Sequence, residues 1–152
     1  MDTIKKTVDA WMADEQLPPR AQFRPVRKFD GLYPEDPVEA EAYWDFIKSC
    51  KPYYETENHI LVHAGLEPET DLEHQEENFT LWQRIFETKP HKSGKTIICG
   101  HTPQPEGYPL KLDHAVCIDT AACRHGWLTC LDIDTGHYWQ ANEEGETRQG
   151  SI

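Results

Sequence analysis

Two short segments constrain this chain more than any other feature: residues 59–65 read H-I-L-V-H-A-G, and residues 96–102 read T-I-I-C-G-H-T. Each is an apolar run that ends in a histidine close to a glycine, a pattern typical of a buried strand that leads into a loop. Sites in α/β and α+β proteins are commonly built where strands end. His63 and His101 are therefore candidate ligands of one metal ion.

Length and charge narrow the class of protein. The 152 residues fit one ordinary domain. Lys and Arg number 15 against 27 Asp and Glu, a net charge of −12, which predicts no nucleic-acid or membrane partner. The absence of a transmembrane-length run, of a secretory signal and of CxxC spacing among the five cysteines predicts a cytoplasmic protein with reduced, mostly buried thiols.

The helices are expected in the first half of the chain. Residues 3–13 have the spacing of a short amphipathic helix, and residues 17–37 form a proline-rich connector. Asp36 and Pro37 predict the start of a second helix that Pro52 ends. Residues 71–87 carry apolar side chains at helical spacing.

The strands are expected mostly in the second half. A hairpin is predicted over residues 53–62, and further strands at 96–99, 115–119, 127–132 and 137–140, with a polar tail that frays from Asn142. This order indicates an α+β or mixed α/β fold. The expected organisation is a helix and connector over 1–36, a domain over 37–141 and a tail over 142–152.

Three motifs carry a family resemblance: V-H-A-G-L at 62–66, L-W-Q-R at 81–84 and I-C-G-H-T-P at 98–103. Together with C-I-D-T (117–120) and W-L-T-C-L-D-I-D (127–134), they resemble the later motifs of the calcineurin-like metallophosphoesterases. The resemblance is to the bacterial PPP-type serine/threonine protein phosphatases and to the related symmetrical diadenosine tetraphosphatases. It extends from about residue 40 to 141.

The resemblance implies a β-sandwich flanked by helices, and hydrolysis of phosphomonoesters by metal-activated water. It implies that His63 and His101 bind the second ion of a two-metal centre, with manganese, iron or zinc as the metal. It implies that Arg84 binds the substrate phosphate, although a solvated helix residue is the plainer interpretation. Asp119 would orient a loop or a ligand, and His125 is expected to be an exposed loop residue.

The family's earlier motifs, G-D-x-H-G, G-D-x-x-D-R-G and G-N-H-E, do not occur in this sequence. They supply the first metal site, the bridging carboxylate and the general acid, so no catalytic residue is assigned here. The chain is therefore expected to be the C-terminal half of such a domain, with the N-terminal half missing through truncation, a split gene or a shortened gene. Two ligands alone predict weak metal binding.

Three functions remain open. The first is a phosphoesterase that acts on phosphoproteins or nucleotides, weak or inactive in this form. The second is a catalytically dead remnant that serves as a binding or regulatory module. The third is a non-enzymatic protein with coincidental His/Gly strand ends.

The missing half also predicts an open hydrophobic edge at the strands before His63 and His101. Self-association is expected unless a complementing N-terminal half, another partner or residues 1–40 cover that edge. The phosphatase interpretation requires that the two imidazoles leave adjacent strands side by side and face the same cavity as Arg84.

Overall fold

The computed structural model describes residues 45, 46 and 49–152. The chain divides into two units, Met1–Cys50 and Lys51–Ile152. In the first unit, Asp45, Phe46 and Ser49 are helical, as the sequence predicts for this segment. The helix expected over 3–13, the connector over 17–37 and the start of the second helix lie outside the described residues.

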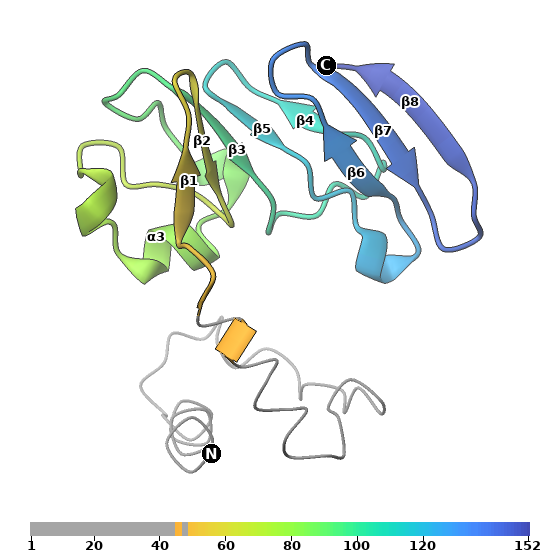
Figure 1. Cartoon of the computed structure of the whole chain (residues 1–152), viewed down its shortest axis with the longest axis horizontal. Helices are drawn as coiled ribbons and strands as arrows, with labels where there is room; N and C mark the ends of the chain where they lie inside the picture. Colours follow the sequence, from red (N-terminus) through yellow and green to blue (C-terminus); the bar gives the residue numbers. More distant parts are fainter. Residues whose placement is uncertain (1–44, 47–48) are drawn as a thin grey trace. The chain divides into compact units, whose positions relative to one another are not determined.

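The second unit contains a five-stranded mixed sheet (Figure 1). Its strands, in spatial order, are β1 (Tyr53–Glu55), β2 (His59–Val62), β3 (Thr96–Cys99), β5 (Ala115–Cys117) and β4 (Leu110–Lys111). β2, β3 and β5 are parallel, whereas the flanking β1 and β4 are antiparallel to their neighbours. The three parallel strands therefore end side by side, and the residues that follow them meet at one end of the sheet.

A three-stranded antiparallel sheet follows, formed by β6 (Leu128–Leu131), β7 (His137–Ala141) and β8 (Thr147–Ser151). The prediction of a fraying tail from Asn142 is wrong, because β8 pairs with β7 along its whole length. Two sheets with few helices confirm the general prediction of a mixed α and β fold. Within the described residues, no helix combines the length and apolar character needed to cross a bilayer.

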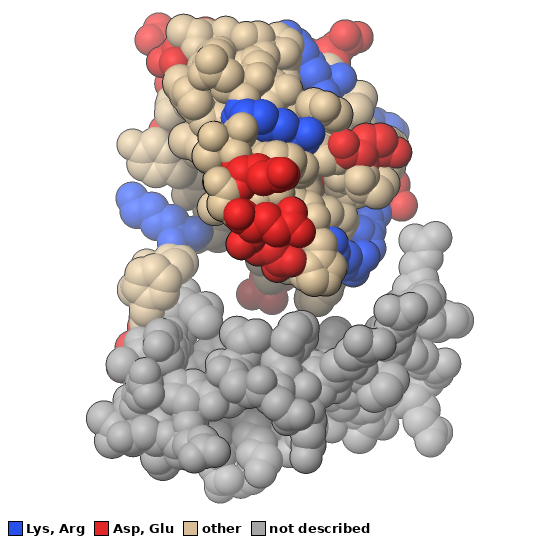
Figure 2. Space-filling view, turned by 90° about the vertical axis from the view of Figure 1, so that its right-hand side faces the viewer, with Lys and Arg blue, Asp and Glu red and all other residues tan. Residues whose placement is uncertain are grey.

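One inward-facing side chain explains why the tail is ordered. The Arg148 guanidinium lies 4.0 Å from the Trp127 ring centroid and 4.1 Å from that of Tyr108. Its Nε donates to Gln140 Oε1 at 2.7 Å. These contacts anchor β8 to the rest of the second unit. Figure 2 shows acidic and basic side chains interspersed on the face that it presents.

The single helix expected over 71–87 is also wrong. The segment forms three short pieces: η1 (Leu72–His74), α3 (Glu77–Trp82) and η2 (Ile85–Glu87). The backbone is extended between them, with ψ of 133° at Gln75 and 144° at Arg84. Hydrogen bonds to other loops replace the hydrogen bonds of a continuous helix. The Gln75 side-chain amide is hydrogen-bonded to the backbone of Glu67, and the Ile85 N–H donates to Thr102 Oγ1 at 3.0 Å.

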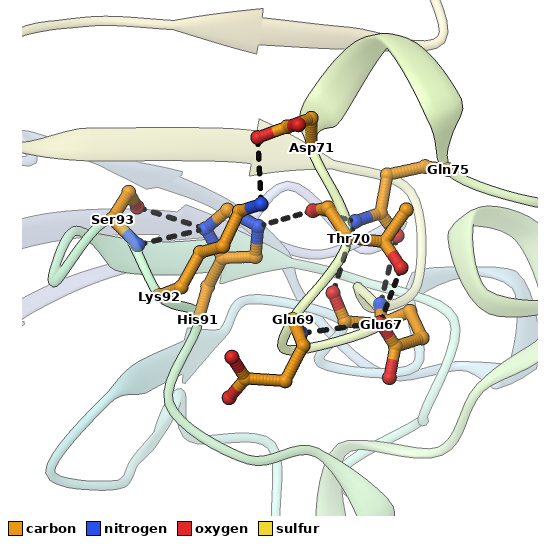
Figure 3. A network of polar contacts seen from close by, with 8 residues as sticks. All are labelled: Glu67, Glu69, Thr70, Asp71, Gln75, His91, Lys92 and Ser93. Atoms are coloured by element: carbon orange, nitrogen blue, oxygen red, sulfur yellow. Dashed lines mark hydrogen bonds and ion pairs between the residues drawn. The ribbon is translucent and has the colours of Figure 1, made fainter.

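The loop after β2 is fixed by a buried histidine (Figure 3). His91 is 4% exposed, and its Nε2 lies 2.9 Å from the carbonyl oxygen of Thr70. Its Nδ1 accepts from the Ser93 N–H at 3.2 Å. An ion pair between Lys92 and Asp71 at 2.7 Å joins the same two loops. His91 therefore has a structural role, holding the segment that follows His63.

The hydrophobic core lies on one face of the five-stranded sheet. It consists of alternate residues of the three parallel strands, one residue of the loop after β2 and the first residue of η2, namely Ile60, Val62, Ile97, Cys99, Ala115, Cys117, Leu66 and Ile85. All of these side chains are at least nine-tenths buried. The core fixes the strand register, and hence the positions of the residues at the strand ends.

The expected open hydrophobic edge is not where the sequence predicts it. β2 and β3 are interior strands, and β1 and β4 form the edges of the sheet. Apolar side chains instead line a groove of about 500 Å³ to which Tyr54, Leu61, Leu81, Ile98 and Ile118 contribute. The short antiparallel strands β1 and β4 cover the edges that the parallel strands would otherwise expose.

Candidate metal and phosphate site

The two predicted histidines lie next to each other. His63 directly follows β2, and His101 follows β3 after one glycine. His63 Nε2 is 3.1 Å from His101 Nδ1, and the ring centroids are 5.0 Å apart. Two nitrogens that each bind a common ion at about 2.1 Å are separated by roughly 3.0–3.4 Å. The spacing fits two ligands of one ion, and it equally fits one hydrogen bond between neutral imidazoles.

The turn after β3 positions His101. This residue has a φ of +61°, in the left-handed region that side chains other than glycine seldom adopt. The conformation is held from both sides, since the Gly100 N–H donates to His63 O at 2.9 Å and the Thr102 N–H donates to Gly100 O at 2.6 Å. Backbone strain of this kind is often concentrated at functional sites.

The surroundings of His101 favour its neutral form. Burial lowers the pKa of His101, and the nearby charges of His63 and Arg84 lower it further. A hydrogen bond with the Trp82 backbone acts in the opposite direction. The Trp82 ring also packs edge-on against His101, with 5.8 Å between centroids. A neutral imidazole keeps a nitrogen lone pair, which metal binding requires.

Arg84 lies beside the histidine pair. It directly precedes η2, which the Ile85–Thr102 bond attaches to the turn that carries His101. The Arg84 guanidinium donates from Nη1 to His101 O at 3.3 Å, and the side chain is exposed. The plain interpretation of Arg84 as a solvated helix residue is therefore incomplete, because a tertiary contact places it at the site.

The expectation that all three side chains face one cavity is met only in part. His63 lines the apolar groove beside the five-stranded sheet, whereas His101 and Arg84 are not among the residues that line it. The Arg84 guanidinium instead contacts the backbone carbonyl of His101, in the turn after β3. The histidine pair and Arg84 form a cluster at the strand ends, and the groove reaches this cluster only at His63.

The described residues supply only part of a metal site. Among them, no group of three or more His, Cys, Asp or Glu side chains is placed to hold an ion. Asp119 follows β5, and its Oδ1 accepts from the Ala121 N–H at 3.1 Å, a loop-orienting role of the kind expected. His125 is exposed and bonds Glu143. The two imidazoles fit a shared ion by their spacing, but a third protein ligand is not found in this part of the chain.

The site also contains residues that the sequence did not reveal. Thr102 links η2 to the His101 turn, and Trp82 contacts the His101 ring. Both belong to the motifs that carry the family resemblance, and their positions in L-W-Q-R and G-H-T-P are the only signal that singles them out. Hydrophobic periodicity alone does not distinguish Thr102 or Trp82 from residues that only support the fold.

The cysteines depart from the expectation in one respect. All five are free thiols, as predicted for reduced cysteines. Only Cys99 and Cys117 are buried, whereas Cys50, Cys123 and Cys130 are exposed, so the prediction of mostly buried thiols is wrong. Cys50 directly follows the helical Ser49, Cys123 lies in a short 3₁₀ helix, and Cys130 is on the outward face of β6.

Comparisons with known proteins add no relative, because neither a protein-family model nor a curated protein matched this chain.

Proposed function

We propose that this chain is the C-terminal half of a calcineurin-like metallophosphoesterase domain, resembling the bacterial PPP-type phosphatases. The observation that carries the proposal is the 3.1 Å separation of His63 Nε2 and His101 Nδ1, with Arg84 bonded to the His101 carbonyl. Three residues spread over 38 positions lie close together, and these are the three to which the resemblance assigns metal or phosphate binding.

In this proposal His63 and His101 bind one divalent ion, with manganese favoured over iron or zinc. Arg84 presents a planar fork of N–H donors that suits two phosphoryl oxygens. When bound, the ion supplies the positive charge that activates water and stabilises the phosphoryl group. Local positive charge is needed here, since a chain with a net charge of −12 repels an anionic substrate.

The proposed activity is hydrolysis of phosphomonoesters on phosphoproteins, with a symmetrical dinucleoside tetraphosphatase as the alternative. The general acid and the bridging carboxylate are missing from the sequence, so activity of this chain alone is proposed to be weak or nil. A complementing N-terminal half would restore it. The free thiols fit a cytoplasmic location.

Metal binding tests the proposal directly. Calorimetric titration of the chain with Mn²⁺ and with Zn²⁺ is expected to detect one weak site. His101→Ala and His63→Ala are each expected to lower its affinity about tenfold or more. His74→Ala is the matched control, because His74 is an exposed histidine on η1. Equal affinities in all four proteins would reject the histidine pair as the metal site.

A binding or regulatory module is the second candidate function. It is favoured by the finding that the described residues offer no group of three metal ligands. The two functions differ in turnover of p-nitrophenyl phosphate with Mn²⁺. Background hydrolysis together with phosphate binding that is lost in Arg84→Gln would favour the module, whereas hydrolysis that His101→Ala abolishes would favour the enzyme.

A further inference from the structure

Two buried cysteines form a pair that the proposed function does not use. Cys99 ends β3 and Cys117 ends β5, and the two are direct register partners in the parallel ladder. Their side chains share the core face of the sheet, where Cys99 is 2% exposed and Cys117 is fully buried. Paired strands lie about 4.8 Å apart, within the range of about 4.4–6.8 Å between Cα atoms that a disulfide bridges.

The two thiols influence each other's ionisation. Interaction with the Cys117 thiol, together with burial, raises the pKa of Cys99, and interaction with the Cys99 thiol lowers the pKa of Cys117 to about 7. Cys99 is also among the residues that line the apolar groove, although its side chain belongs to the core. Because both side chains are buried, a small oxidant is expected to reach the pair more readily than a bulky thiol reagent.

The Cys117 thiol also contacts the turn that carries His101. Its Sγ lies 3.4 Å from Gly100 O and 3.3 Å from Thr102 O, so the thiol proton is directed at carbonyls on both sides of His101. Gln104 Nε2 reaches the same sulfur at 3.8 Å. Loss of the thiol proton would remove the donor from this turn, whose left-handed residue depends on its neighbours to stay in place.

We propose that Cys99 and Cys117 form a redox-active dithiol that closes to a disulfide with peroxide and thereby alters the turn that positions His101. The Cys117 sulfur attacks peroxide, one oxygen is transferred to give a sulfenic acid, and the other oxygen leaves as water. The Cys99 sulfur then displaces the sulfenic oxygen as a second water. Two thiols and one peroxide thus give one disulfide and two waters, and the two electrons come from the sulfurs.

The dithiol and its effect on the turn stand without the proposed function. Only a consequence for metal affinity would rest on it, and the experiment therefore uses the metal-free chain. A failure of disulfide formation and a failure of metal binding are then separate results. Cys99 and Cys117 are register partners on neighbouring strands, and the spacing of their Cα atoms suits a disulfide. We therefore expect the disulfide to form without unfolding of the sheet.

The test uses a background in which the three exposed cysteines, Cys50, Cys123 and Cys130, are replaced by serine. Hydrogen peroxide is expected to lower the intact mass by two hydrogen atoms, and a thiol reductant to restore it. After trypsin digestion, residues 96–111 and 112–124 are expected to appear as one linked species. Cys99→Ser in the same background is the control, and it is expected to gain oxygen without losing two hydrogens.

Imidazole resonances report the effect on the turn. The His101 and His63 ring signals are expected to shift between the reduced and oxidised forms, while those of the exposed His74 stay in place. The natural chain, alkylated before and after peroxide treatment, gives the same linked peptide if the serine background folds poorly. Two thiols that stay reduced, oxygen adducts without a linked peptide, or unchanged His101 signals in the disulfide form would each overturn the proposal.

Discussion

His63 Nε2 and His101 Nδ1 lie 3.1 Å apart although 38 residues separate them in the sequence. The parallel pairing of β2 with β3 brings them together, because His59 is opposite Thr96 and both strands run in the same direction. The facing nitrogens form one hydrogen bond, and the protonation of His101 is coupled to the stability of the fold because its pKa is lowered in the folded chain.

The free energy of unfolding is expected to fall as the pH drops below the ordinary histidine range. The pKa of His101 is lower in the folded chain than its usual 6.5, so the unfolded chain takes up this proton first. This destabilisation grows as the pH falls from 6.5 towards the lowered pKa, and it is absent above that window. Urea denaturation at about pH 7.5 and about pH 5.5 measures it.

His101→Gln is expected to remove this part of the pH dependence, whereas His74→Gln is expected to keep it. Asp71 and Asp132 do not interfere, because their pKa values are lowered from 3.8 and their stabilising effect is lost only at more acidic pH. His125 acts in the opposite direction over the same range, because its hydrogen bond with Glu143 raises its pKa, so the His101 contribution is measured as the difference between His101→Gln and the wild type. A wild-type slope in His101→Gln would contradict the assignment.

Gly65→Ala is expected to destabilise the chain by about 1–3 kcal/mol. A Cβ at this position would overlap Gln83 Oε1 and lie 3.1 Å from Thr88 Cγ2. The Gln83 oxygen ends a flexible side chain and is buried without a hydrogen-bond partner, so its displacement breaks no hydrogen bond, and the expected loss comes from the close contacts with Gln83 and Thr88. Gly100→Ala is the matched control, because its Cβ would make only ordinary contacts, at 3.6 and 3.9 Å. Urea denaturation of both variants checks this, and equal losses would refute the packing argument.

The strands were predictable where the pattern was local. The run Thr96–Cys99 is a strand over its predicted range, since β-branched residues bounded by Gly94 and Gly100 leave few alternatives. The hairpin from Tyr53 to Val62 follows for the same reason. The two-residue strand β4 was missed, because it pairs only where β5 provides a partner.

The predictions that were wrong depend on contacts between residues distant in the sequence. The helix expected over 71–87 is interrupted at Gln75 and Arg84 by hydrogen bonds to other loops, and hydrophobic periodicity carries no information about such bonds. The tail is ordered because Arg148 reaches back to Gly107, 41 residues earlier. The histidine pair was predictable because His63 and His101 each follow a buried strand, but the residues that orient them were not.

His91→Leu is expected to destabilise the chain by about 2–3 kcal/mol. The substitution keeps the volume roughly constant but leaves the Thr70 carbonyl and the Ser93 N–H without their ring partner. His74→Leu changes an exposed histidine nearby and is expected to change stability by less than about 0.5 kcal/mol. Thermal unfolding compares the two variants. Similar melting temperatures would mean that the buried network contributes nothing net.

The contacts of Arg148 give the last prediction. Arg148→Met keeps the length of the side chain but removes its hydrogen bonds to Gln140 and Gly107 and its stacking between Tyr108 and Trp127. The expected loss is about 2–3 kcal/mol, since a hydrogen bond from a charged donor contributes about 1.5–3 kcal/mol and each ring contact about 0.5–1 kcal/mol, in part non-additively.

Tryptophan fluorescence is expected to respond as well, because Trp127 loses a cation that lies against its ring. The control is Arg124→Met, which changes an exposed arginine at the end of η3 (Ala122–Arg124) and is expected to leave stability and fluorescence nearly unchanged. Deletion of residues 147–152 is expected to cost more than Arg148→Met, since it also removes the pairing of β7 with β8. A deletion that leaves the unfolding transition unchanged would show that β8 adds nothing to the stability of the second sheet.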